Sequence, residues 1–96
     1  MISTKERAVL KSIAVNLNAT MQIGKDGITD NVLSQVEEIL YNKVILKINV
    51  LRNCEYSAKE VLNELCQKLN AHPVQAIGNK AVIYKRSNKK DINHIL

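Results

Sequence analysis

The spacing of apolar residues changes repeatedly along this 96-residue chain, and this alternation constrains the fold more than any other feature. Three segments repeat apolar residues every third or fourth position, as amphipathic helices do, and four shorter segments have the composition or alternation of strands. We expect helices at about Thr4–Asn16, from Thr29 or Asp30 to about Asn42, and at Ser57–Leu69, and strands at Thr20–Ile23, Val44–Val50, Pro73–Ile77 and Ala81–Tyr84. The predicted order is therefore α-β-α-β-α-β-β.

This order predicts a two-layer α/β fold with a four-stranded mixed sheet backed by helices. Two β-α-β crossovers of this length are right-handed almost without exception, and Gly78-Asn79 can form the turn of an antiparallel terminal hairpin. The core must consist of Leu, Ile, Val and Ala, because the chain has no Phe and no Trp. We expect one domain over residues 1–86, followed by a basic, flexible tail over residues 87–96.

Two of the expected helices begin with a capping-box pattern. Ser3-x-x-Glu6 and Ser57-x-x-Glu60 have the spacing at which the two side chains satisfy free backbone N–H groups reciprocally. The start of the middle helix is less defined, since Thr29 and Asp30 are both good N-cap residues.

The segment Gly24-Lys25-Asp26-Gly27 lies between an expected strand and the start of a helix. Its glycines let the backbone approach a ligand closely, the helix start offers free N–H groups to a phosphate, and Lys25 adds a mobile charge. A G-x-x-G clamp also holds single-stranded RNA in KH domains. The alternative is a plain strand-to-helix turn with a solvated lysine, which the motif taken alone favours; the basic chain and the adjoining helix start favour the phosphate site.

Basic residues outside this loop fall into two groups, and fourteen Lys and Arg against nine Asp and Glu give the chain a formal charge of +5. Such an excess favours a polyanionic partner, although ordinary solvation also explains it. The groups are Arg7 and Lys11 in the first helix, and Lys80, Lys85, Arg86, Lys89 and Lys90 in the last strand and tail. Because Tyr41, Tyr56 and Tyr84 are the only aromatic rings, we expect phosphate contacts rather than base stacking to dominate binding.

The remaining chemistry-bearing residues suggest no enzyme, metal site or cofactor. His72, His94, Cys54 and Cys66 lack zinc-ligand spacing, and no catalytic arrangement or nucleotide-binding P-loop is visible. The charged N-terminus and the lack of a long apolar run indicate neither an export signal nor a membrane span. We therefore expect a cytoplasmic monomer with free thiols, no membrane association and no small-molecule substrate.

Several segments together resemble one known family. Gln22–Thr29 closely resembles the Gln-Ile-Gly-Lys-x-Gly-Leu-Thr signature of the CRM domain (chloroplast RNA splicing and ribosome maturation), whose stand-alone bacterial form is the YhbY type. Similar matches follow in the same order along the chain: Lys5–Lys11, Lys47–Cys54, Val74–Gly78 and Val82–Arg86.

The resemblance implies a fold similar to the C-terminal domain of bacterial translation initiation factor three. It also implies binding of ribosomal RNA and association with precursors of the large ribosomal subunit. The residues expected to contact RNA are Gly24, Lys25, Asp26, Gly27, Arg7, Lys11, Arg52, Lys80, Lys85 and Arg86. The alternative is a protein-interaction module that docks on a ribosomal protein, with apolar contacts and little salt dependence.

Overall fold

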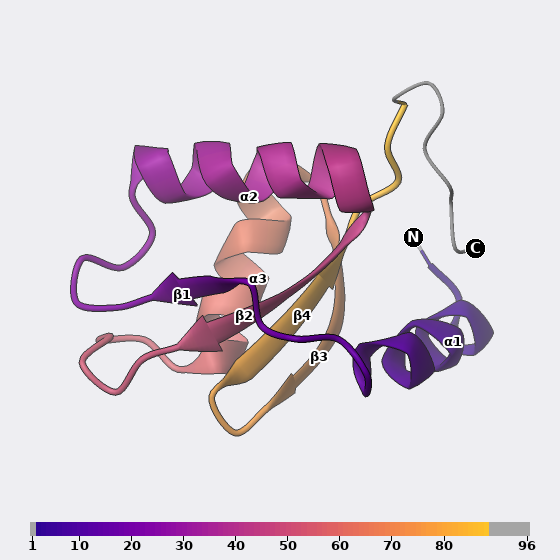
Figure 1. Cartoon of the computed structure of the whole chain (residues 1–96), viewed down its shortest axis with the longest axis horizontal. Coiled ribbons are helices and arrows are strands. Elements are labelled where there is room, and N and C mark those ends of the chain that lie inside the picture. The colour runs from indigo at the N-terminus through magenta and orange to yellow at the C-terminus, as the bar shows by residue number, and fades with distance from the viewer. Residues whose placement is uncertain (1, 89–96) are drawn as a thin grey trace.

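The computed structural model describes residues 2–88, and its elements follow the expected order (Figure 1). They are α1 (Thr4–Ala14), β1 (Met21–Ile23), α2 (Asp30–Lys43), β2 (Ile45–Val50), α3 (Ala58–Leu69), β3 (His72–Ile77) and β4 (Lys80–Tyr84).

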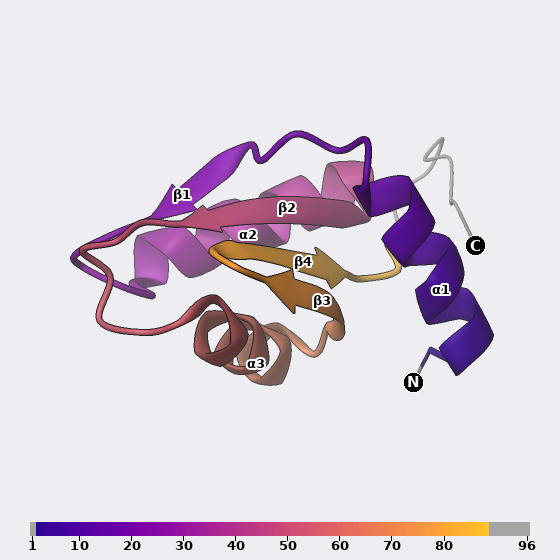
Figure 2. The ribbon, with the colours of Figure 1, turned by 90° about the horizontal axis from the view of Figure 1, so that it is seen from below.

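The four strands form one mixed sheet in the order β1-β2-β4-β3. β1 pairs with β2 in parallel, whereas β4 lies antiparallel between β2 and β3. The expected α/β fold with a four-stranded mixed sheet is confirmed. Helices α2 and α3 cover one face of the sheet, and α1 lies at one end of the molecule (Figures 1 and 2).

The two faces of the sheet bury separate apolar clusters, because side chains alternate along each strand. Leu46, Ile48, Ala81 and Ile83 pack with residues of α2 and α3, including Val36, Leu40 and Leu65. On the opposite face, Ile45, Val82 and Tyr84 pack with Leu10 and Ala14 of α1. Since α1 contacts only that end, the other end of the same face carries polar side chains.

The sequence signals for the helix starts are confirmed. In both capping boxes the serine hydroxyl accepts from the glutamate backbone N–H, and the glutamate carboxylate accepts from the serine N–H. Thr29, and not Asp30, caps α2 through a 3.1 Å hydrogen bond from the Val32 N–H. Helix α1 ends at Ala14, two residues before the expected end, because the chain there tightens into a turn with a hydrogen bond from Leu17 N to Ala14 O.

The expected start of the second strand at Val44 is wrong by one residue. Val44 ends α2 in the left-handed conformation, with φ of 62°, and its side chain is fully buried. A β-branched residue is strained in that conformation, which glycine usually occupies at helix ends. The direct passage from α2 into β2 therefore depends on a buried apolar side chain at a position that favours glycine.

The packed part of the chain continues at least to Ser87, the first residue of the expected tail. The Ser87 side chain is buried and its hydroxyl donates a 2.7 Å hydrogen bond to the Tyr41 carbonyl. Residues 89–96, which make up most of the expected tail, lie outside the described residues.

Candidate functional site

Residues Gly24–Gly27 form a hydrogen-bonded turn in which the Gly27 N–H donates to the Gly24 carbonyl at 3.0 Å. Lys25 and Asp26 at its centre are exposed, whereas Gly27 is buried and has φ of 67°. Within residues 2–88, the backbone N–H groups of Lys25 and Asp26 donate to no protein acceptor. The turn therefore presents two backbone donors and a lysine to solvent, a combination suited to an anion.

The connection between β2 and α3, residues 51–57, packs beside this turn. The Leu51 N–H donates to the Ile23 carbonyl at 2.8 Å, which joins the two segments where β1 ends. A Cβ atom at Gly24 would lie only 3.2 Å from the Asn53 Oδ1, and one at Gly27 would lie 3.9 Å from the Tyr56 ring. Glycine at position 24 thus allows Asn53 to lie close to the turn, and the connection covers one side of the turn.

Three of the expected cationic contacts lie at this end of the molecule. Lys25 is in the turn, Arg52 is exposed in the adjacent connection, and Lys80 begins β4. Asn49 in β2 pairs with Gln22 of β1 on one side and with Lys80 on the other. Lys80 therefore lies in the same row across the sheet as Gln22, with only β2 between them.

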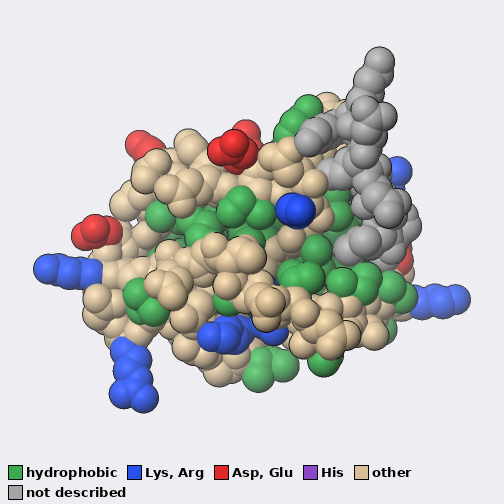
Figure 3. Space-filling view, in the orientation of Figure 1, with side chains coloured by type: hydrophobic (Ala, Val, Ile, Leu, Met, Phe, Trp, Pro, Cys, Tyr) green, Lys and Arg blue, Asp and Glu red, His purple; other side chains and the backbone are tan. Residues whose placement is uncertain are grey.

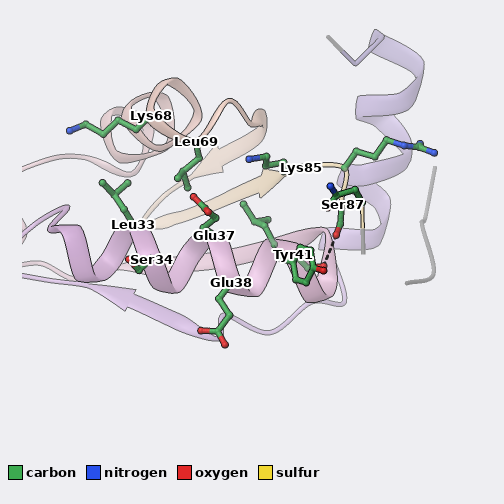
Figure 4. A pocket seen from close by; sticks show the side chains of 12 residues that line it. Leu33, Ser34, Glu37, Glu38, Tyr41, Lys68, Leu69, Lys85 and Ser87 are labelled. Carbon is green, nitrogen blue, oxygen red and sulfur yellow. Dashed lines mark hydrogen bonds between the residues drawn. The ribbon is translucent and has the colours of Figure 1, made fainter. Parts of the chain in front are cut away.

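The other four cationic residues lie toward the opposite end of the long axis, where α1 and the C-terminal end of α2 are found (Figures 1 and 2). Arg7 in α1 donates from its Nε to the Pro73 carbonyl at 3.2 Å, and Lys11 is exposed on the same helix. Lys85 and Arg86 line a cavity of about 830 Å³ together with Glu37 and Glu38 of α2 (Figure 4).

The cationic residues expected to contact RNA therefore fall into two separate sets. Figure 3 shows Lys and Arg side chains projecting at both ends of the molecule, with acidic side chains over α2. The structure brings Lys25, Arg52 and Lys80 to one end, and separates them from the four cationic residues at the other.

Two polar residues on the open part of the sheet were not among the expected contacts. Lys47 donates from its Nζ to the Ala14 carbonyl at 3.2 Å, and the Asn49 Oδ1 accepts from the Lys80 Nζ at 2.8 Å. The signal for both was present in the alternation of β2, since Lys47 and Asn49 occupy every second position between buried residues. That alternation indicates a polar face, but the sequence does not show that α1 leaves part of it uncovered.

Other chemistry in the described part of the chain is sparse. No group of three His, Cys, Asp or Glu side chains there is placed to hold a metal ion, and neither cysteine forms a disulfide. Burial raises the pKa of the Cys66 thiol to about 11, so that this sulfur is protonated at neutral pH. No helix within residues 2–88 combines the length and apolar character needed to span a membrane.

Comparisons with known proteins find similar sequences over nearly the whole chain. The family model described as the CRS1 / YhbY (CRM) domain matches residues 2–85. The chain is 36% identical to the Probable RNA-binding protein YqeI of Bacillus subtilis, over 93% of each chain. It is 30% identical to a Haemophilus influenzae protein named RNA-binding protein, over 95% of this chain and 92% of that one.

A solved structure has the same fold. The solution structure of the hypothetical protein SAV1595 from Staphylococcus aureus superposes with a TM-score of 0.78 at 34% identity, over 95% of both chains. The residues matched by the family model include the turn at Gly24–Gly27 and every helix and strand of the described structure. This chain belongs to the CRS1/YhbY (CRM) domain family.

Proposed function

We propose that this protein binds RNA through the sugar-phosphate backbone, with the turn at Gly24–Gly27 as the central contact. The observation that carries the proposal is an exposed turn whose two free backbone N–H groups lie beside the Lys25 side chain. The names of two relatives, which describe RNA-binding proteins, support the class of ligand.

Arg52 and Lys80 extend this contact on the same end of the molecule. Their charges add to that of Lys25, and fixed amide donors need no reorganisation to meet a phosphate oxygen. Asp26 is exposed in the same turn, and its carboxylate repels a phosphate. The backbone N–H groups, and not the side chain at position 26, are therefore the proposed contacts at the centre of the turn.

A salt titration of RNA binding tests the proposal. Each phosphate contact contributes a slope of about −0.7 on single strands to the plot of log K against log salt. Lys25→Ala should weaken binding roughly five- to tenfold for every sequence tested, and should make the slope shallower by about one contact. Lys68→Ala is the control, since Lys68 lies on α3, where its Nζ is 3.9 Å from the Glu64 carboxylate.

The same titration separates RNA binding from the alternative of a protein-interaction module. Phosphate-led binding falls steeply with salt, whereas apolar docking on a ribosomal protein changes little. Equal binding by wild type, Lys25→Ala and Arg52→Ala at all salt concentrations would remove the turn from the proposed interface.

We further propose that the RNA is ribosomal and that the protein acts on precursors of the large ribosomal subunit, without catalysis. This finer assignment is supported by the resemblance of Gln22–Thr29 to the CRM signature. Crosslinking in cells, followed by sequencing of the attached RNA, should enrich large-subunit ribosomal RNA. Crosslinks distributed in proportion to RNA abundance would contradict it.

A further inference from the structure

The β2–α3 connection places an aromatic ring against the proposed phosphate-binding turn. Tyr56 is 45% exposed although it is one of only three aromatic residues in the chain. The nearest neighbour of a Cβ atom at Gly27 would be the Cε2 atom of this ring, at 3.9 Å. The ring therefore borders the turn at Gly27, while nearly half of the Tyr56 surface is open to solvent.

The connection that carries this ring is anchored at both ends. The Leu51 N–H bonds the Ile23 carbonyl on one side of the connection, and Ser57 caps α3 on the other. The close approach of Asn53 to Gly24 adds a third constraint. Because the connection is anchored in this way, the backbone that carries Tyr56 is held beside the turn.

We propose that Tyr56 stacks on an unpaired base of the nucleotide whose phosphate the turn binds, and that the site therefore selects single-stranded RNA over a continuous duplex. This inference rests on the proposed function. Bases within an A-form duplex already stack on one another, so only an unpaired base can turn toward a protein ring. Arg52 in the same connection adds a guanidinium, which contacts either the backbone or the base plane.

The inference reverses the expectation drawn from the scarcity of aromatic residues. Three rings in the whole chain argued against stacking, but the relevant quantity is the number of exposed rings at the turn. Tyr84 is buried, and Tyr41 lies at the C-terminal end of α2. Tyr56 is the ring that the fold brings to Gly27.

Binding to a short unstructured RNA and to the duplex formed with its complement tests this assignment. Tyr56→Ala should weaken single-strand binding on the order of tenfold and leave duplex binding unchanged. Tyr56→Phe should retain single-strand binding, since stacking needs the ring and not the hydroxyl. Tyr41→Ala is the matched control, because Tyr41 is 47% exposed at the far end of α2.

A second measurement does not depend on removing the ring. The chain has no Trp, so Tyr56→Trp introduces a single indole whose emission should be quenched by the single strand and not by the duplex. Thermal unfolding of each variant checks that the fold is intact. If Tyr56→Ala is unfolded, the quenching of Tyr56→Trp emission replaces it as the test.

The outcomes separate the two proposals. If wild type binds neither RNA, the proposed function fails. If Lys25→Ala weakens binding but Tyr56→Ala binds both RNAs as wild type does, the stacking assignment alone is wrong. Equal loss on single strand and duplex also overturns the stacking assignment, as does indole emission from Tyr56→Trp that stays unquenched when the single strand is bound.

Discussion

The Asn49 side-chain oxygen accepts a 2.8 Å hydrogen bond from the Lys80 Nζ across the β2–β4 pair. The same oxygen accepts a second 2.8 Å bond from the Asn79 side chain. One amide therefore orients a half-buried lysine on the open part of the sheet, at the end that carries the turn. A lysine held in this way loses less conformational freedom when it meets a phosphate than a free one does.

This arrangement predicts coupling between the two residues in RNA binding. Lys80→Ala should weaken binding several-fold, and Asn49→Ala should weaken it by a smaller factor because the charge remains but its orientation is lost. The double variant should bind no worse than Lys80→Ala alone, as a double-mutant cycle by filter binding will show. Fully additive losses would mean that Asn49 contributes independently of Lys80.

The second prediction concerns the effect of substituting Gly27 on stability. Its φ of 67° is unfavourable for residues with a Cβ, while the space beside it would allow an ordinary contact with Tyr56. Gly27→Ala should therefore lower the free energy of unfolding by about 1–2 kcal/mol through backbone strain alone. Gly27→Asn should cost less, since asparagine tolerates the left-handed region, and urea denaturation distinguishes the two variants. Equal losses would point to crowding instead.

At position 44 the glycine variant should be more stable than the alanine variant, which is the reverse of the usual order within a helix. Both substitutions truncate the buried side chain, alanine to a methyl group and glycine to hydrogen, but only glycine relieves the left-handed strain at φ of 62°. Val44→Gly should therefore be more stable than Val44→Ala by about 1 kcal/mol. Val36, buried within α2, is the matched control: there alanine should be more stable than glycine by about 1 kcal/mol. Urea denaturation followed by circular dichroism measures all four variants.

The capping boxes predict how stability depends on pH. The hydrogen bond from the Ser57 backbone N–H, helped by the Ser57 hydroxyl, holds the pKa of Glu60 below its ordinary value of 4.5. The unfolded chain therefore binds this proton more readily, so stability falls as the pH drops from about 5 through the folded pKa. Glu6 has the same arrangement with Ser3.

Glu60→Gln keeps an acceptor for the Ser57 N–H but does not titrate. Its melting temperature should be lower than that of wild type at neutral pH, and the two should converge in acid. Ser57→Ala removes the cap itself and should cost about 1 kcal/mol at neutral pH. Parallel pH profiles for wild type and Glu60→Gln would show that the carboxylate charge has no part in the cap.

Local sequence signals were sufficient to predict the structure where a residue's role depends only on its neighbours in the chain. The pairs Ser3–Glu6 and Ser57–Glu60 fixed two helix starts, because a capping box involves only four neighbouring residues. The alternation of β2 likewise matches its pattern of buried side chains. The end of α2 was harder to predict, since Val44 is a typical strand residue, and in the structure it caps the helix with its side chain packed against α1 and the sheet.

The sequence by itself determined the order of the elements, the glycine turn and the family, because each is given by motifs along the chain and does not depend on which segments are in contact. Only the tertiary structure decided which side chains share a surface. It separated Arg7 and Lys85 from Lys25, and it brought Tyr56, 29 positions beyond Gly27 in the chain, to 3.9 Å from the place where a Cβ atom at Gly27 would lie. The physical reason is that strand order and helix placement follow from the burial of apolar faces, which joins distant segments without any local signal in the polar residues they carry.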